Sequence, residues 1–131
     1  MPTLIRLLAL AFLVIGALFL RSLMHGDRKV DTYYAALRAD LRMVARAQSA
    51  HLSARRRYAR SLDSLAAGRF GNGDLHLSEG VRITITHADE YRWEAVATHT
   101  QLPTRCVYRD TAPPRSVPSF SDFRRFCESP P

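Results

Sequence analysis

The stretch that decides the fold is residues 30–51, VDTYYAALRADLRMVARAQSAH. Apolar or weakly polar side chains recur in it at steps of four and three residues, the spacing of one face of an α-helix. This stripe consists of Val30, Tyr34, Leu37, Leu41, Val44, Gln48 and His51. The opposite face carries Asp31, Arg38, Arg42 and Arg46. Because no Pro or Gly occurs from residue 28 to 67, we expect helix over that range, and its apolar face needs a partner.

An apolar segment precedes this helix. Residues 7–20 read LLALAFLVIGALFL, with no polar side chain, between Arg6 and Arg21. If both arginines reach the interfaces, residues 4–24 form a helix about 31 Å long, enough to cross a bilayer. We therefore predict a transmembrane anchor over residues 1–24, followed by one small domain over residues 25–131.

Two features of the anchor bear on its role. Gly16 and Ala17 would allow close packing against other transmembrane helices. A cleaved signal peptide is the alternative, but only Arg6 precedes the apolar run and no small-x-small cleavage site follows it. We therefore expect an uncleaved anchor.

The partner of the amphipathic helix is expected to be a small antiparallel sheet. Residues 81–87, VRITITH, alternate with period two, and residues 91–98 alternate again after a short turn, with Tyr91 and Trp93 on one face. Residues 105–109 give a third strand, so the sheet covers 81–109. Four glycines in residues 68–80 predict a loop between helix and sheet. The fold class is therefore α+β.

The chain has two cysteines, Cys106 and Cys127. In a small extracytoplasmic domain, two cysteines predict one disulfide. The bond would stabilise the domain by about 3 kcal/mol. It would also attach the Pro-rich tail, residues 110–131, to the last strand. The alternative is two free thiols in a cytoplasmic domain. Basic residues follow the apolar segment at Arg21, Arg28 and Lys29, and this count favours the cytoplasmic side.

The order of these elements resembles the type IV pilin and pseudopilin family. Residues 2–8, PTLIRLL, are similar to the mature pilin start F-T-L-I-E-L, and residues 47–51, AQSAH, with Tyr58 resemble the helix end of small pilins. The resemblance implies a pilin-like fold, with a long helix packed on a three-stranded sheet and a C-terminal disulfide loop. It also implies a periplasmic domain anchored in the inner (cytoplasmic) membrane, and we prefer this orientation to the one from the charge count.

Two departures from the family matter. The family has a cleavable leader, whereas Met1 directly precedes the matching segment here. The family's fifth-position glutamate neutralises a neighbour's free amine in the filament, whereas this chain has Arg6, and two cations would repel each other there. Both departures predict a pilin-like scaffold with another use.

No constellation of catalytic residues is present. The sequence has no nucleophile elbow and no H-E-x-x-H, and neither the cysteines nor the five histidines are spaced as zinc ligands. His87 and His99 would lie at opposite ends of a hairpin, and His51 is expected to be a boundary residue of the stripe. We therefore predict no enzyme activity, no cofactor and no metal.

Two stretches are candidate partner surfaces. The first is a charge run of Arg55, Arg56, Arg57 and Arg60, which suits an acidic partner or phosphate but lies up to ~46 Å from the anchor along a straight helix. The second is a ridge of Phe120, Phe123 and Phe126 with Arg124 and Arg125 between them. The alternative for each stretch is a structural role without a partner. The charge run would then be a solvated helix end, and the ridge would pack in the core. Net charge is +7, but no aromatic-basic strand motif accompanies it, so nucleic acid is not an expected partner.

These features predict a non-enzymatic subunit of a larger membrane assembly, in contact with the lipid bilayer and other integral membrane proteins. Photosynthetic reaction-centre and light-harvesting complexes are one possible setting, and secretion machinery and envelope complexes are others. The first alternative is a minor pilin or pseudopilin of a type IV pilus or type II secretion system. The second is a secreted binding domain released by signal cleavage.

Overall fold

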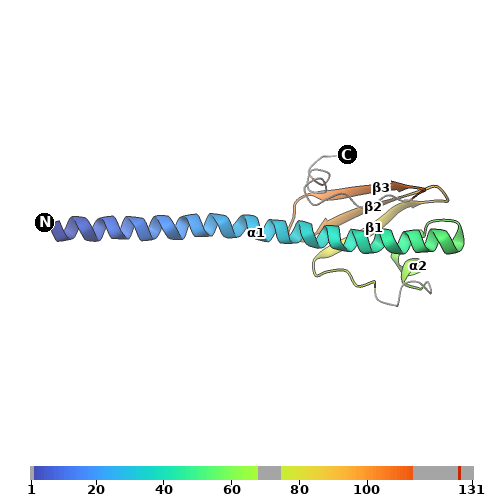
Figure 1. Ribbon diagram of the computed structural model, residues 1–131, viewed down its shortest axis with the longest axis horizontal. Coiled ribbons are helices and arrows are strands. Elements are labelled where there is room, and N and C mark those ends of the chain that lie inside the picture. The colour runs from blue at the N-terminus through green and yellow to red at the C-terminus, as the bar shows by residue number, and fades with distance from the viewer. Residues whose placement is uncertain (1, 68–74, 114–126, 128–131) are drawn as a thin grey trace. The chain divides into compact units, whose positions relative to one another are not determined.

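The computed structural model describes residues 2–67, 75–113 and 127. The elements in order are α1 (Pro2–Arg55), α2 (Leu62–Ala66), β1 (Val81–Ala88), β2 (Arg92–His99) and β3 (Arg105–Thr111) (Figure 1). The chain consists of two compact units, Met1–Thr32 and Tyr33–Pro131. The predicted α+β class is confirmed.

The first unit is the apolar part of α1. The side chains of its large apolar residues between Leu4 and Leu23 are all solvent-exposed, from 55% at Leu8 to 76% at Phe12. By its length and composition this helix could span a membrane. Gly26 lies within α1, so this glycine does not end the helix.

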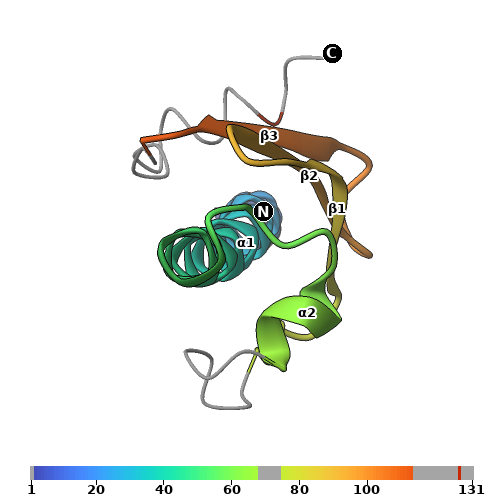
Figure 2. The ribbon, with the colours of Figure 1, turned by 90° about the vertical axis from the view of Figure 1, so that its right-hand side faces the viewer.

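The second unit buries the predicted stripe. Leu37, Leu41, Val44 and Gln48 are completely buried and Tyr34 is 4% exposed, while His51 at the end of the stripe is partly exposed. Val30, which is also partly exposed, belongs to the first unit. Figure 2, a view along α1, shows the three strands on one side of this part of the helix. The predicted packing of the stripe on a sheet is therefore confirmed.

The sheet is antiparallel, in the order β1-β2-β3. Val81 pairs with His99 and Thr98 pairs with Arg105, and the register of β1 shifts by one residue between Ile85 and His87, as at a β-bulge. Side chains alternate between the faces as predicted. The buried ones are Ile83, Trp93, Ala95, Ala97, His99, Cys106, Tyr108 and Asp110. Three predicted strands are confirmed, but the prediction for Tyr91 is wrong, because this side chain lies in the turn before β2 and is 73% exposed.

The loop before β1 is fixed to α1. Asp40, which is 6% exposed, accepts hydrogen bonds from Ser78 N at 2.6 Å and Ser78 Oγ at 3.0 Å. Gly80 follows with a φ of +79°, and a Cβ there would lie 2.8 Å from Thr100 Oγ1. Only glycine suits both conditions. Residues 68–74 of the predicted loop lie outside the described residues.

The prediction of one helix over residues 28–67 is confirmed to Arg55 and again over Leu62–Ala66, but it is wrong for the segment between them. Arg56 has a φ of 60°, and its N–H still bonds to Leu52 O at 2.8 Å, as in a left-handed helix cap. An extended segment follows, and α2 begins after Ser61, whose hydroxyl accepts from Ser64 N.

The cause of the break is the buried side chain of Gln48. Its Nε2 donates to Ala59 O at 2.9 Å, and its Oε1 accepts from Ala59 N at 2.8 Å. These two bonds satisfy both backbone groups of a residue that is 2% exposed. Tyr58 N donates to Asp89 O at 2.9 Å, which ties the same segment to the sheet. The backbone therefore has better partners outside the helix than within it.

Replacing Gln48 with Leu, which has a similar volume, should lower the free energy of unfolding by about 2–4 kcal/mol, because both polar groups of Ala59 would be buried without partners. Urea denaturation in detergent, followed by fluorescence of Trp93, measures this, since Trp93 is the only tryptophan and is 1% exposed. Ser53→Ala, at an exposed helix position, is the control and should change stability by less than about 0.5 kcal/mol. Equal stabilities of Gln48→Leu and the control would contradict this account.

The predicted disulfide is present. Cys106 in β3 is bonded to Cys127, and both residues are buried, at 0% and 3% exposure. Cys106 lies on the face of the sheet that also carries Tyr108, as predicted. The bond therefore attaches the chain near its C-terminus to the core of the second unit.

The double substitution Cys106→Ser with Cys127→Ser should lower the free energy of unfolding by about 3 kcal/mol. A reductant should lower the urea midpoint of the natural chain to about that of the double variant. It should leave the midpoint of the double variant unchanged. If the reductant has no effect on the natural chain, the disulfide does not stabilise it.

Candidate partner-binding surface

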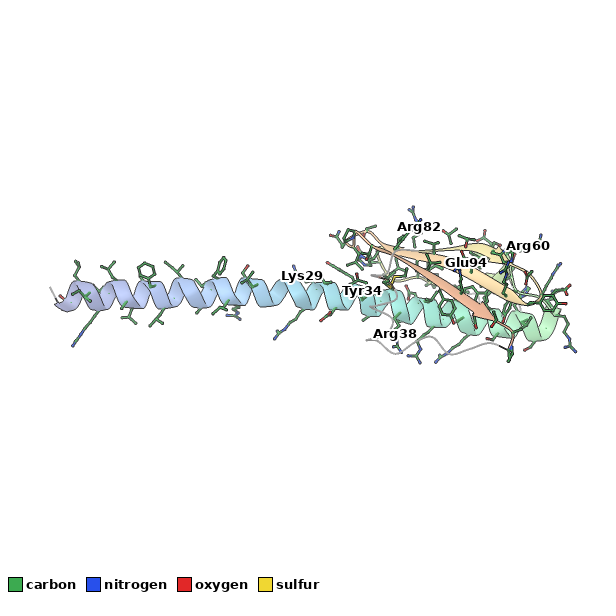
Figure 3. All side chains as sticks on the ribbon, turned by 90° about the horizontal axis from the view of Figure 1, so that it is seen from above. Lys29, Tyr34, Arg38, Arg60, Arg82 and Glu94 are labelled. Carbon is green, nitrogen blue, oxygen red and sulfur yellow. A yellow bond between two sulfur atoms is a disulfide. The ribbon has the colours of Figure 1, made fainter. Side chains whose placement is uncertain are left out.

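The charge run predicted as a partner surface is divided by the end of α1. Arg55 is the last residue of the helix, Arg56 is the left-handed residue after it, and both are exposed. Arg57 and Arg60 are also exposed, but they flank two buried residues of the extended segment. Figure 3 shows Arg60 at the end of the second unit where α1 ends, and Tyr34 at the opposite end.

The backbone between Arg57 and Arg60 is held at each residue. His51 Nδ1 lies 2.9 Å from Arg57 O, and because a carbonyl oxygen only accepts, Nδ1 is the donor. Tyr58 N bonds to Asp89 O, and Ala59 bonds twice to Gln48. The two arginines therefore project from a fixed backbone, which lowers the entropy lost when they bind a ligand.

Two small hollows adjoin this segment. The first has a volume of about 170 Å³ and is lined by His51, Arg57, Tyr58, Ala59, Arg60 and Ser64. The second, of about 260 Å³, is lined by Arg57, Tyr58, Arg60, Ala88, Asp89, Glu90 and Tyr91. Both share Arg57, Tyr58 and Arg60, so the two hollows adjoin each other. We call Arg57, Arg60 and Tyr91 the Arg57–Tyr91 surface.

The turn that presents Tyr91 is organised by Asp89. Its Oδ1 accepts from Tyr91 N at 2.7 Å and from Arg92 N at 2.8 Å, and its Oδ2 lies 2.9 Å from His87 Nε2. These hydrogen bonds, that with His87 first, lower the pKa of Asp89 to about 2. Asp89 is thus ionised at neutral pH, and its acceptor sites are occupied within its own turn.

The charges around this surface are unevenly paired. Arg92 lies 3.8 Å from Asp89, and Arg109 forms an ion pair with Glu94 at 2.5 Å, which lowers the pKa of Glu94. Among the described residues, no carboxylate lies within ion-pair distance of Arg57 or Arg60. Arg57 and Arg60 therefore present positive charge that no described carboxylate pairs with at close range, beside an exposed aromatic ring and the carboxylates of Asp89 and Glu90.

A third hollow, of about 490 Å³, lies at the same end of the sheet. Its lining residues are His87, Arg92, Trp93, Glu94, Arg109, Asp110 and Thr111. Behind it, the rings of Trp93 and Tyr108 pack with centroids 5.1 Å apart, and burial with the nearby Asp110 carboxylate raises the pKa of Tyr108 to about 12. Tyr58, 6.5 Å from Trp93 by ring centroids, has its pKa raised by burial and then by Asp110. These side chains are buried in the core of the second unit, and Trp93 and Asp110 also line the hollow.

His87 and His99 lie where the sequence predicted. His87 and His99 pair with Glu94 and Val81, at opposite ends of the β1–β2 hairpin. His99 is 6% exposed, stacks on Tyr33 at 4.4 Å and accepts from Gln101 N through Nδ1. Within residues 2–67, 75–113 and 127, no group of three potential metal ligands occurs.

Other predicted site residues have different outcomes. Gly16 and Ala17 are exposed on the apolar part of α1, where their role in helix packing stays a prediction. The ridge lies outside the described residues, namely Phe120, Phe123, Arg124, Arg125 and Phe126. Tyr91 was not predicted as a surface residue, although Asp89, two positions before it, is a typical turn residue and indicates that the turn includes Tyr91 and that the next strand starts later.

Comparisons with known proteins give no relatives. No protein-family model, no curated protein and no solved structure matches this chain.

Because the folded-state pKa of Asp89 is below its ordinary value of 3.8, the ionised carboxylate stabilises the fold above that pH, and this contribution is lost as pH falls through about 2. Carboxyl ¹³C NMR should show Asp89 titrating near pH 2. In Asp89→Asn, which keeps an acceptor oxygen but cannot ionise, unfolding free energy should fall less between pH 4 and pH 2 than in the natural chain. A titration midpoint near 3.8 would contradict the role of these hydrogen bonds.

Proposed function

We propose that this chain is a non-enzymatic, membrane-anchored structural or assembly subunit of a larger membrane protein complex. The exposed apolar surface of residues 3–23 carries this proposal. Soluble proteins rarely expose an apolar surface of this extent, whereas lipid and apolar helices would bury it favourably, at about 25 cal/mol per Å² in transfer from water. Gly16 and Ala17 offer a position where a neighbouring helix could approach closely.

The Cys106–Cys127 disulfide supports placing the second unit in the periplasm, with the anchor in the inner (cytoplasmic) membrane. Cytosolic reductants keep most thiols reduced, so a buried disulfide is typical of an oxidising compartment. The basic residues Arg21, Arg28 and Lys29 favour the opposite orientation by the charge rule. We give the disulfide more weight, because charge biases orientation whereas a reducing compartment would remove the bond.

The use of buried polar groups supports a structural role for the second unit. Asp40 holds Ser78, Gln48 holds Ala59, and Asp110 accepts from Thr111 N at 2.9 Å. In each case the side chain satisfies a backbone group, which stabilises the fold and leaves that side chain less available for chemistry.

A minor pilin or pseudopilin is the second candidate. The order of elements supports it, since α1 continues from an apolar part into a part that packs on a three-stranded sheet closed by a disulfide. Arg6, in place of the family's glutamate, opposes filament assembly by charge repulsion in an apolar setting. We therefore rank this candidate below the membrane-complex subunit.

The test is a mild detergent extract of the native membrane, separated on a density gradient, with thiols blocked at lysis. We expect the chain to migrate with a large complex, at full length and with its disulfide intact by mass spectrometry. Co-migrating proteins would identify the process, including a photosynthetic or secretion complex. The proposal fails if the chain migrates alone, or if its mass shows that the apolar segment, about 24 residues, has been removed.

A further inference from the structure

The Arg57–Tyr91 surface combines three properties found at protein-binding sites. Arg57 and Arg60 have no ion-pair partner among the described residues. Their backbone is fixed by His51, Gln48 and Asp89. Tyr91 is 73% exposed on a turn held by two hydrogen bonds. Tyrosine and arginine are among the residues that most often dominate binding energy at protein interfaces, and a fixed backbone lowers the entropy lost on binding.

We propose that this surface binds an acidic segment of a partner protein, with one carboxylate of that segment seated between Arg57 and Arg60. The inference rests on the proposed function in taking the partner to be a subunit of the same complex. Guanidinium groups bind carboxylates through two parallel hydrogen bonds, so paired arginines recognise an acidic side chain well.

The size of the hollows fits this ligand. The hollow lined by His51, Arg57, Arg60 and Ser64 has a volume of about 170 Å³, below the roughly 300–1,000 Å³ of most small-molecule sites. It admits one acidic side chain. The adjoining 260 Å³ hollow, beside Tyr91, would take a neighbouring side chain of the same segment.

The rim charges favour a protein segment over a lipid surface. Asp89 and Glu90 line the second hollow and directly precede the exposed Tyr91 in the chain. A uniformly anionic membrane would bring headgroup phosphates against these carboxylates, which costs free energy. A peptide can place a carboxylate at the arginines and neutral or basic groups opposite Asp89 and Glu90.

The first experiment measures binding of a fluorescein-labelled hexaglutamate peptide to the full-length chain in zwitterionic nanodiscs by fluorescence anisotropy. Arg57→Glu with Arg60→Glu should weaken binding about tenfold or more. The control is Arg42→Glu with Arg46→Glu, which changes the net charge equally at exposed positions of α1 and should weaken binding about twofold at most. Tyr91→Ala should weaken binding without any change in charge. Buried Trp93 fluorescence and the disulfide report folding, and Arg57→Gln with Arg60→Gln replaces the first variant if it does not fold.

Equal losses in the two charge-reversed variants would overturn the inference, because binding would then follow net charge. A second arm uses vesicles of phosphatidylglycerol, which should be bound equally by both variants. If Arg57→Glu with Arg60→Glu reduces vesicle binding more than the control and peptide binding no more than the control, the surface recognises lipid headgroups and the proposal is wrong.

The same variants in the native membrane separate this inference from the proposed function. If the natural chain and the Arg42/Arg46 control migrate with the complex and the Arg57/Arg60 variant does not, both proposals are supported. If all three migrate with the complex, the subunit function stands and the docking surface is wrong. If the natural chain migrates alone, the subunit function is wrong, and peptide binding alone decides the docking surface.

Discussion

The second unit depends on the pair of hydrogen bonds between the Gln48 amide and the backbone of Ala59. A buried amide costs stability unless its donor and acceptor are both satisfied, and here one residue satisfies them together. The contact has three consequences. It ends the long helix, it places Tyr58 in the core against Trp93, and it leaves Arg57 and Arg60 at the surface on a fixed backbone. The core and the candidate binding surface therefore rest on the same two bonds.

The features that follow from local periodicity could be predicted from the sequence. The stripe from Tyr34 to Gln48 and the alternation of Val81–Ala88 depend on which face of one element is buried, and neighbouring residues determine that pattern. The disulfide between Cys106 and Cys127 followed from composition. The apolar helix, which could span a membrane, followed from the run of apolar residues.

The end of α1 could not be predicted in this way. Nothing local disfavours helix at Arg56 to Arg60, where arginine, tyrosine and alanine are all compatible with it. The break comes from the side chain of Gln48, which bonds to Ala59 eleven residues later, and from the carbonyl of Asp89 in the β1–β2 turn, which bonds to Tyr58 N. Tyr91 was misplaced for a local reason, since Asp89 accepts hydrogen bonds from the N–H groups of Tyr91 and Arg92, and the turn it forms delays the start of β2 to Arg92. Tertiary contacts thus decide where Arg57 and Arg60 lie, whereas a local turn decides the position of Tyr91.

The register shift between Ile85 and His87 has a consequence for how copies of this chain could associate through their sheets. In the strand order β1-β2-β3, β1 is an edge strand. Its unpaired backbone groups could pair with the same edge strand of a neighbouring copy. A β-bulge twists an edge strand and interrupts its regular row of backbone N–H and C=O groups. The bulge would therefore hinder copies of this chain from pairing edge to edge into a continuous β-sheet. Their association would then depend on side-chain contacts.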